Sequence, residues 1–527
     1  MRVAVYDRYW STGGGGEKFA GGIAAALAQA GDHQVDLLAH EPVDRAWLGE
    51  RLGLGLDPVG VRLVPEAAGG VTAASAEYDL LVNASYQSGD PSRAGAALYV
   101  VHFPGPLPSG PARARTRLAR WGTAALGGAA IAWGEGFYLP EQTRLHTLRW
   151  TAGDAALVVS VPEGAPRAPV PVVVHLGRFV PAEVGPIEVT AEVDGATVGK
   201  AVVNAPGGRT ERRSVALSFA VEVGPGHPVT VHLRCPPWVP AEHGIGTDTR
   251  RLGVPVLGAH AGGGRGATVA RAVPQLVGPG AGLDFLASYD RVVANSAYTQ
   301  GWTERMWGRC DGVLYPPVTP VAPAAKEPII LSVGRFFVPG TGHNKKQLEM
   351  VGAFRRLVES GGAEGWSYHL VGGCSPEHRP YLDEVERAAA GLPVVIHADA
   401  SGAERDDLYG RASIFWHAAG LGEDPERHPD RYEHFGITTV EAMSAGAVPV
   451  VIDAAGQAEI VEQGRSGMRF HELDGLVNTT RWLIEADERR GEMAVAARER
   501  AHGFSWAPFV DHVHVEVAAA LRVAATR

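Results

Sequence analysis

Apolar residues in the first third of the chain form short strand-like runs, separated by helical runs and glycine turns. RVAVYD predicts a buried strand, STGGGGEKF a glycine-rich turn, and AGGIAAALAQAG a helix that ends at a glycine. HQVDLLAH, YDLLVNAS and AALYVVHFPG predict further strands. Strands that alternate with helices are typical of a doubly wound parallel sheet. Such sheets bind ligands at the carboxyl ends of their strands, where the glycine turn and His102 are both expected.

The region 152–255 has a different pattern, without a helical period. Short β-rich runs such as VPVVVHL and RSVALSFAVEV are spaced by proline and glycine, and Asp194-Gly195 predicts a two-residue hairpin turn. Five or more short strands without helices indicate a β-sandwich. Because the α/β pattern resumes after the segment AHAGGGRGA, the sandwich is predicted to be an insertion.

The last part of the chain is again α/β, with strands such as EPIILSVGRFF and SIFWHAA between amphipathic helices. We therefore predict an α/β protein with two Rossmann-like domains that face a cleft. The predicted boundaries are 1–151 and 256–322 for the N-terminal domain, 152–255 for the inserted β-rich domain, 323–505 for the C-terminal domain, and 506–527 for a C-terminal helix that packs back toward the N-terminal domain.

Length, net charge and composition argue against several classes of function. A chain of 527 residues is too long for one core, and a net charge of -10 argues against general nucleic-acid binding. The three cysteines are widely separated, which fits a reducing compartment, and neither a signal peptide nor a membrane-spanning run is seen. These features predict a cytoplasmic protein. Lysine is scarce: five lysines stand among 48 basic residues, so a retained lysine is of interest.

The segment RYEHFGITTVEAMSAGAVPVV, residues 431–451, carries the clearest chemical signal. Glu433 and Glu441 lie eight residues apart, on either side of a predicted helix start near Ile437. Free amides at a helix start bind anions, and Gly436 lets the backbone approach a ligand closely. The carboxylates repel phosphate but accept hydrogen bonds from hydroxyls. A ligand with phosphate in the middle and hydroxyls at both ends has the shape of a nucleotide sugar.

With these motifs in place, the chain resembles the retaining glycosyltransferases of family 4, which have the GT-B fold. The resemblance rests on the Glu-x7-Glu pattern together with ILSVGRF, HLVGG, AMSAGAVPVV, VVANSAYT and VLYPPV, in the family's order, and covers most of the chain outside 152–255. EHFGI and YVVHFP resemble the subgroup with the mannosyltransferases of lipid-linked oligosaccharide synthesis. This implies transfer of a hexose from GDP-mannose or a UDP-sugar to a glycan, lipid-linked or small-molecule acceptor.

The resemblance also implies roles for individual residues. Glu433 would contact the donor sugar and Glu441 the ribose, while Arg335 and Lys345 would neutralise the leaving diphosphate, with Lys346 as a substitute for Lys345. His102 is expected beside the acceptor or the donor phosphate. The remaining donor-binding residues, which would contact the sugar and diphosphate, are Gly13, Gly14, Gly15, Gly16, His434, Phe435, Gly436, Ile437 and Thr438.

No cofactor and no metal are expected, because arginine, lysine and a helix start would carry the charge that develops on the diphosphate. The leaving phosphate would take the acceptor's proton on the same face of the sugar, which gives retention. A covalent intermediate on Glu433, as in retaining glycosidases, is not expected.

Plainer interpretations remain beside each of these. The two glutamates, Arg335 and Lys345 could be ordinary solvated charges, and His102 a core histidine. The whole chain could be a catalytically silent sugar- or nucleotide-sugar-binding protein, or a GT-B epimerase. Free nucleoside diphosphate released during turnover would exclude an epimerase.

An arginine-rich segment precedes Trp121 and a small apolar stretch. It could bind anionic lipid headgroups and hold the protein at the inner membrane face. A solvated helix face in an arginine-rich chain is the favoured alternative. The arginines concerned are Arg113, Arg115, Arg117 and Arg120.

Overall fold

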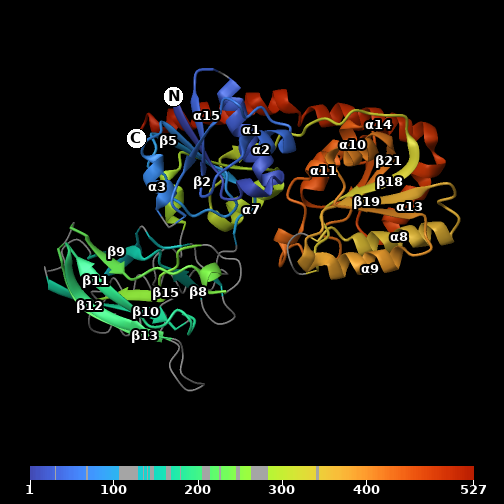
Figure 1. Ribbon diagram of the computed structural model, residues 1–527. Coiled ribbons are helices and arrows are strands. Elements are labelled where there is room, and N and C mark those ends of the chain that lie inside the picture. The colour runs from blue at the N-terminus through green and yellow to red at the C-terminus, as the bar shows by residue number, and fades with distance from the viewer. Residues whose placement is uncertain are drawn as a thin grey trace.

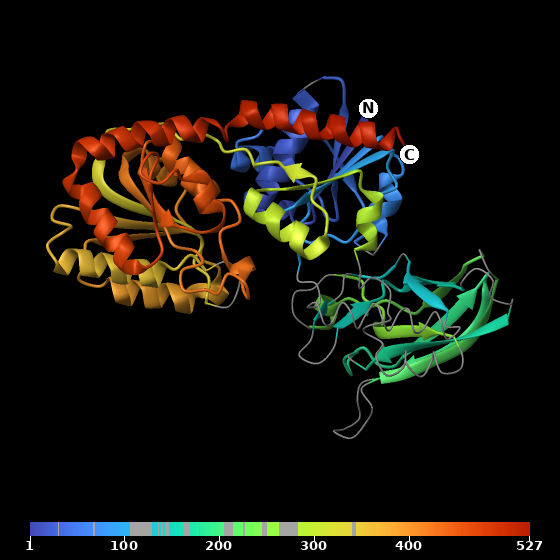
Figure 2. The same ribbon diagram turned by 180° about the vertical axis from the view of Figure 1, so that it is seen from behind.

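The computed structural model describes residues 1–29, 31–66, 69–105, 129–134, 136–138, 141–142, 147–161, 168–178, 180–204, 214–224, 227–244, 250–262, 283–339 and 344–527. Two α/β domains lie beside each other, and a β-sandwich extends from the first of them (Figure 1). The view from behind shows the same division, with the last helices running along both α/β domains (Figure 2).

The N-terminal domain is built on a seven-stranded parallel sheet in the order β17-β16-β5-β4-β1-β2-β3. Its central strands are apolar on both faces because helices cover both sides, and all six residues of β5 are buried. The strands are β1 Arg2–Tyr6, β2 Gln34–Ala39, β3 Gly60–Leu63, β4 Leu80–Asn83, β5 Ala96–Val101, β16 Arg291–Ala294 and β17 Gly312–Val313. The helices are α1 Gly15–Gln29, α2 Arg45–Leu52, α3 Gly70–Ser75 and α7 Ala297–Trp307, with 3-10 turns at Trp10–Thr12 and Asp284–Ser288.

The C-terminal domain repeats this plan with a six-stranded parallel sheet in the order β20-β19-β18-β21-β22-β23. The strands are β18 Glu327–Val333, β19 Ser367–Gly372, β20 Val394–Ala398, β21 Ala412–His417, β22 Val448–Ile452 and β23 Met468–Phe470. The helices are α8 Gln347–Glu359, α9 Arg379–Ala389, α10 Gly402–Arg411, α11 Ile437–Ser444, α12 Ala455–Ile460, α13 Leu473–Glu485 and α14 Asp487–His502, with 3-10 turns at Pro376–His378 and Pro429–Arg431. In both sheets the strand order reverses beside the first strand, which is where α/β sheets bind ligands.

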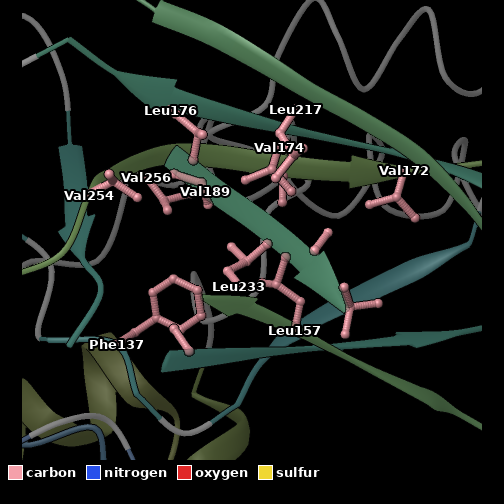
Figure 3. Close-up of a cluster of buried hydrophobic side chains, with 14 of the residues drawn as sticks. Phe137, Leu157, Val172, Val174, Leu176, Val189, Leu217, Leu233, Val254 and Val256 are labelled. Atoms are coloured by element: carbon pink, nitrogen blue, oxygen red, sulfur yellow. The ribbon is translucent and has the colours of Figure 1, made fainter. Parts of the chain in front are cut away.

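The inserted domain is a sandwich of two antiparallel five-stranded sheets, β13-β10-β15-β8-β7 and β12-β11-β14-β9-β6. Figure 3 shows side chains from both sheets meeting between them, among them Val174 of one sheet with Leu157 and Leu233 of the other. The strands are β6 Ala130–Trp133, β7 Glu141–Gln142, β8 Thr147–Trp150, β9 Asp154–Ser160, β10 Ala168–Gly177, β11 Ile187–Val193, β12 Ala196–Val203, β13 Ser214–Val223, β14 Val229–Arg234 and β15 Pro255–Ala261, and Pro240–His243 form a 3-10 turn. The hairpin at Asp194-Gly195 joins β11 to β12, with both residues at positive φ as a type I′ turn requires.

The sandwich is larger than the predicted range 152–255, because its strands begin at Ala130 and end at Ala261. The last strand of the sandwich, β15, was not predicted from the sequence. β15 lies between β10 and β8, and nearly all its residues are buried, so apolar and polar positions do not alternate along it.

The glycine-rich segment also differs from the prediction of a turn. Only Gly13 and Gly14 precede the helix, and α1 already begins at Gly15, so that Gly15 and Gly16 form its first turn. The acid Glu17 in this turn suits the positive end of the helix dipole.

The predicted C-terminal helix corresponds to α15, Trp506–Ala524. Its buried residues recur at helical spacing, and they pack against α1 and β5 of the N-terminal domain. An ion pair between Arg291 and Glu516, 2.7 Å apart, joins the helix to β16. The last helix of the chain thus ties the C-terminal domain back to the first.

Candidate functional site

The segment with the two glutamates lies at the carboxyl end of the C-terminal sheet. β21 ends at His417, a loop carries Glu433, and α11 begins at Ile437. Gly436 caps this helix with a φ of 121°, a conformation that favours glycine. The amides of Ile437 and Thr438 belong to the first turn of α11 and have no carbonyl partner within the helix. The helix start is therefore a place where an anion can bind.

Phe435 contributes its backbone to this loop, not its ring. The side chain is 3% exposed and packs against Tyr315 and Phe504, with ring centroids 5.6 and 5.3 Å away. Packing in this cluster holds the loop in place, so only the main chain of Phe435 can face a ligand.

Glu433 forms a partly buried charge cluster with two residues from other elements. Its Oε2 atom lies 2.5 Å from Nζ of Lys345, which precedes α8, and 3.0 Å from Nε2 of His417. Burial would raise the pKa of Glu433, but the Lys345 charge and the hydrogen bonds from His417 and Lys345 hold it well below its usual value. Burial also lowers the pKa of His417. Glu433 is thus ionised, and a neutral His417 donates to it from Nε2.

His417 was not among the residues predicted from sequence. The available signal was its position as the last residue of SIFWH, because the end of a central strand is where α/β sheets place functional side chains. The histidine is 3% exposed, and its hydrogen bond from Nε2 holds the Glu433 carboxylate in place.

Lys345 and Lys346 point to different acids. Lys346 adopts a left-handed backbone conformation and binds Glu423 at 2.8 Å, and Glu423 also accepts from Arg431 at 2.8 Å. Lys345 therefore contacts Glu433, and Lys346 does not. Residues 340–343, between Arg335 and Lys345, lie outside the described residues.

Glu441 occupies the inner face of α11, where it meets both domains. Its Oε2 atom accepts a hydrogen bond from Tyr409 of α10 at 3.1 Å, and its Oε1 atom lies 3.5 Å from Nζ of Lys18 in α1. The residue is 8% exposed. A carboxylate so placed can accept hydroxyl hydrogen bonds beside the start of α11.

Three of the four predicted glycines face the C-terminal domain or His102. A Cβ atom on Gly14 would lie 3.1 Å from a guanidinium nitrogen of Arg335, and one on Gly15 would lie 3.3 Å from Cδ1 of Ile437. Gly16 faces His102, with 3.7 Å from its Cβ position to Cε1 of the ring. The glycine segment therefore approaches Arg335 and the α11 start without side chains in between.

Gly13 is turned the other way. Its carbonyl accepts a hydrogen bond from Arg51 of α2 at 3.1 Å, and its φ of 52° lies in the left-handed region. Its glycine is needed for the bend that precedes α1.

His102 and Phe103 follow β5 and form the opposite wall. His102 donates from Nε2 to the Ala84 carbonyl at 2.6 Å, and burial lowers its pKa, so the ring is neutral. Phe103 stacks on His434 of the C-terminal domain, with ring centroids 4.2 Å apart and planes at 12°. His434 thus packs against the N-terminal domain, which is a contact that the sequence does not show.

Two further acids lie beneath the glycine segment. Glu17 accepts hydrogen bonds from the amide of Gly14 at 2.5 Å and the hydroxyl of Thr12 at 2.6 Å, and Asp7 accepts one from the Tyr9 amide at 3.0 Å. Burial, and next the negative charge of Glu17, raises the pKa of Asp7 to about 7. Asp7 is 1% exposed.

Asp7→Asn is expected to stabilise the protein more at pH 8 than at pH 5.5. The folded state holds the Asp7 proton more tightly than the unfolded chain, so folding stability falls as pH rises from about 4 toward 7. An asparagine does not ionise, and the gain in free energy of unfolding should be larger at pH 8 by on the order of 2 kcal/mol. Chemical denaturation at both pH values measures this. Asp57→Asn, at an exposed aspartate, is the control. Equal gains at the two pH values would show that Asp7 titrates normally.

The arginines at 113, 115, 117 and 120 lie outside the described residues. None of the described helices combines the length and the apolar character that a membrane crossing requires. Within the described ranges, no group of three or more His, Cys, Asp or Glu side chains is arranged to hold a metal ion.

Two Rossmann-like domains that lie on either side of a site define the GT-B fold of glycosyltransferases. Residues 320–500, which contain Arg335, Lys345, Glu433 and Glu441, match the family model "Glycosyl transferases group 1".

Two curated proteins match part of the chain. Sulfoquinovosyl transferase SQD2 of Arabidopsis thaliana is 26% identical over 132 residues, and alpha-maltose-1-phosphate synthase of Mycolicibacterium smegmatis is 30% identical over 163 residues. The matches cover 24% and 26% of this chain, and they span 24% and 41% of the respective relatives.

Solved structures resemble the chain over nearly its whole length. A glycosyltransferase from Rickettsia africae has a TM-score of 0.52 at 11% identity, covering 98% of each chain. Anabaena Alr3699/HepE, solved in complex with UDP, has a TM-score of 0.51 at 12% identity, covering 98% of this chain and all of its own. At such low identity these likenesses show the fold alone.

Proposed function

We propose that this protein is a retaining glycosyltransferase that transfers a hexose from a nucleotide-diphosphate sugar to an acceptor. The observation that carries the proposal is the arrangement around the start of α11. Glu433, paired with Lys345, precedes this helix start, and Glu441 follows it within the helix. Gly14 of the N-terminal domain approaches Arg335 of the C-terminal domain and closes the site. The glycosyltransferase group 1 match over 320–500 supports the same class of reaction.

The diphosphate of the donor would bind at the amides of Ile437 and Thr438. As the bond from the sugar to the phosphate breaks, negative charge collects on the phosphate and positive charge on the sugar. Arg335 and Lys345 would stabilise the phosphate, because fixed charges aimed at developing charge lower the barrier most. Glu433 would hold the sugar hydroxyls, kept ionised by Lys345 and in place by His417.

The acceptor proton would pass to the leaving phosphate on the same face of the sugar, which retains the anomeric configuration. In this scheme the chain's own cations and helix start neutralise the phosphate, so transfer is proposed to need no metal. His102 is neutral and hydrogen-bonded to Ala84, and its ring faces Gly16, so we propose a positioning role for it beside the phosphates.

For the donor, we propose GDP-mannose or a UDP-sugar. The EHFGI form of the motif suggests the first, and its His434 stacks on Phe103 of YVVHFP, which joins the two motifs of that subgroup. The acceptor is proposed to be a glycan, a lipid-linked sugar or a small molecule.

A catalytically silent nucleotide-sugar-binding protein is the second candidate. It is disfavoured by the Lys345–Glu433–His417 cluster, since a protein that only binds has no need for a cation held beside the bond that would break.

A thermal-shift screen tests donor binding. The purified protein is heated with GDP, UDP, ADP or dTDP and the corresponding sugars in the presence of a chelator. One nucleotide series should raise the melting temperature by several degrees at about 100 times Kd. Glu441→Ala should lose this response, because it removes the acceptor proposed for the ribose hydroxyls.

Turnover is then measured with the same donor as release of nucleoside diphosphate, and the anomeric configuration of the product by NMR. Binding without release in the presence of candidate acceptors would favour the silent protein. A product of inverted configuration, or a strict need for a divalent metal, would contradict the proposed mechanism.

A further inference from the structure

Lys18 of the N-terminal domain reaches into the part of the site formed by the other domain. It lies in the first turns of α1, and its ammonium is 3.5 Å from Oε1 of Glu441 in α11. The Lys18 side chain is 12% exposed and that of Glu441 is 10% exposed. The pair is therefore largely shielded from solvent, and it joins the two domains.

Local helix stability does not account for this lysine. A positive charge near the start of a helix opposes the helix dipole, so acids are preferred there. The chain has five lysines among 48 basic residues, and its surface cations are mostly arginines. An ammonium is a compact donor that can serve several acceptors at once, whereas a guanidinium is a planar fork that needs more room.

The position of Lys18 is fixed by the glycine segment. Its amide donates to the Gly14 carbonyl at 2.9 Å, so both belong to one turn of chain. Gly14 is the residue that approaches Arg335. Lys18 and Arg335 thus flank the same stretch of backbone, one directed at Glu441 and the other beside Gly14.

Glu441 can hold Lys18 and a ligand together. Its Oε2 atom accepts from Tyr409, and Oε1 faces Lys18. Because an ionised carboxylate offers about four acceptor positions, two remain for hydroxyls. A ribose bound there would lie next to the ammonium, with its diphosphate directed toward the α11 start.

We propose that Lys18 is a nucleotide-binding residue, supplied by the N-terminal domain, that contacts the ribose and diphosphate beside Glu441. Nucleotide affinity then depends on the approach of the two domains, because one domain provides the acceptor and the other the cation. The inference rests on the proposed function in taking Glu441 as the ribose ligand.

The opposite role makes a different prediction. If Lys18 only occupied Glu441 in the absence of ligand, it would compete with the ribose, and its removal would leave nucleotide binding unchanged or make it tighter. The sign of the change in Kd therefore separates a ligand from a competitor.

The experiment measures Kd by isothermal titration with the nucleoside diphosphate that gives the largest thermal shift. Lys18→Met should raise Kd by about 10–100-fold, as expected for a lost hydrogen bond to a charged group. Lys18→Arg should restore part of the affinity. In turnover, Lys18→Met should raise KM for the donor more than it lowers kcat.

Arg305→Met is the matched control, because Arg305 also forms an ion pair across the domains, with Glu426, but in an exposed position away from the site. Its Kd should stay within about 3-fold of the wild-type value, since exposed pairs contribute little. The double variant Lys18→Met with Glu441→Gln should lose less affinity than the product of the single losses, because the two side chains are in contact.

An unchanged or lower Kd in Lys18→Met overturns the inference, and so does an equal loss in Arg305→Met. Nucleotide binding without sugar transfer in the wild type would defeat the proposed function while leaving the Lys18 result readable. A wild-type protein that binds none of the four nucleoside diphosphates overturns both.

Discussion

Lys345→Met is expected to lower kcat by about 10²–10³-fold, the usual effect of removing one group that stabilises charge in a transition state. Lys345 is a partly buried cation 2.5 Å from Glu433, which lies in the loop that precedes the start of α11, where the diphosphate is proposed to leave. Methionine has a similar length and keeps the packing, so the loss should appear in kcat more than in the melting temperature. Nucleoside diphosphate release at saturating donor measures it.

The same substitution should change the pH profile. Lys345 is the main reason that the pKa of Glu433 stays below its usual value in spite of burial. Without that charge, burial raises the pKa, and Glu433 takes up a proton at higher pH than in the wild type. The acid limb of the rate profile should therefore move toward neutral pH in the variant.

Lys346→Met provides the comparison, because Lys346 is adjacent in sequence but binds Glu423. It should lower kcat much less than Lys345→Met. If the two variants lost activity in the reverse order, Lys346 would be the cation that serves the diphosphate.

The fold was largely predictable because its signals are local. Alternation of apolar runs with helical periods indicates two parallel sheets. The glutamates at 433 and 441 are recognisable because they lie on either side of a glycine at a predicted helix start. Burial on both faces made the strands of the two sheets recognisable as continuous apolar runs. β15 was missed for another reason: it is buried without a clear alternation, and its last residues, 259–261, belong to the segment AHAGGGRGA that was interpreted as a linker.

The partners of the site residues were harder to predict, since they come from distant parts of the chain. Lys18 and Glu441 are 423 positions apart in sequence, taking 441 minus 18, and only the packing of two domains brings them together. The stack of Phe103 on His434 has the same origin. His417 is a middle case, because its strand was predicted but the direction of one side chain at the strand end was not.

Gly456→Ala is expected to lower nucleotide affinity and activity by at least about 100-fold, although Gly456 contacts no proposed ligand. Gly456 lies in α12 directly under the loop that carries Glu433, and its amide donates to the Glu433 carbonyl at 3.0 Å. A Cβ atom there would lie 2.5 Å from Cα of Phe435 and 2.6 Å from the carbonyl oxygen of His434. These are backbone atoms, so rotation of a side chain cannot relieve the overlap.

The loop must therefore shift, and the shift moves Glu433 and the helix start that would hold the diphosphate. A displacement of this kind in a packed region costs about 1–3 kcal/mol of stability, which lowers the melting temperature without unfolding the protein at 25 °C. Circular dichroism, titration with nucleoside diphosphate and turnover are measured on the same preparation.

Gly352→Ala is the control, because Gly352 lies within α8 and a Cβ atom there meets nothing within 4 Å. Its activity should persist, with equal or slightly higher stability. Since Gly456 touches the site only through the main chain of this loop, a folded Gly456→Ala protein with full activity would mean that the position of the loop does not govern catalysis.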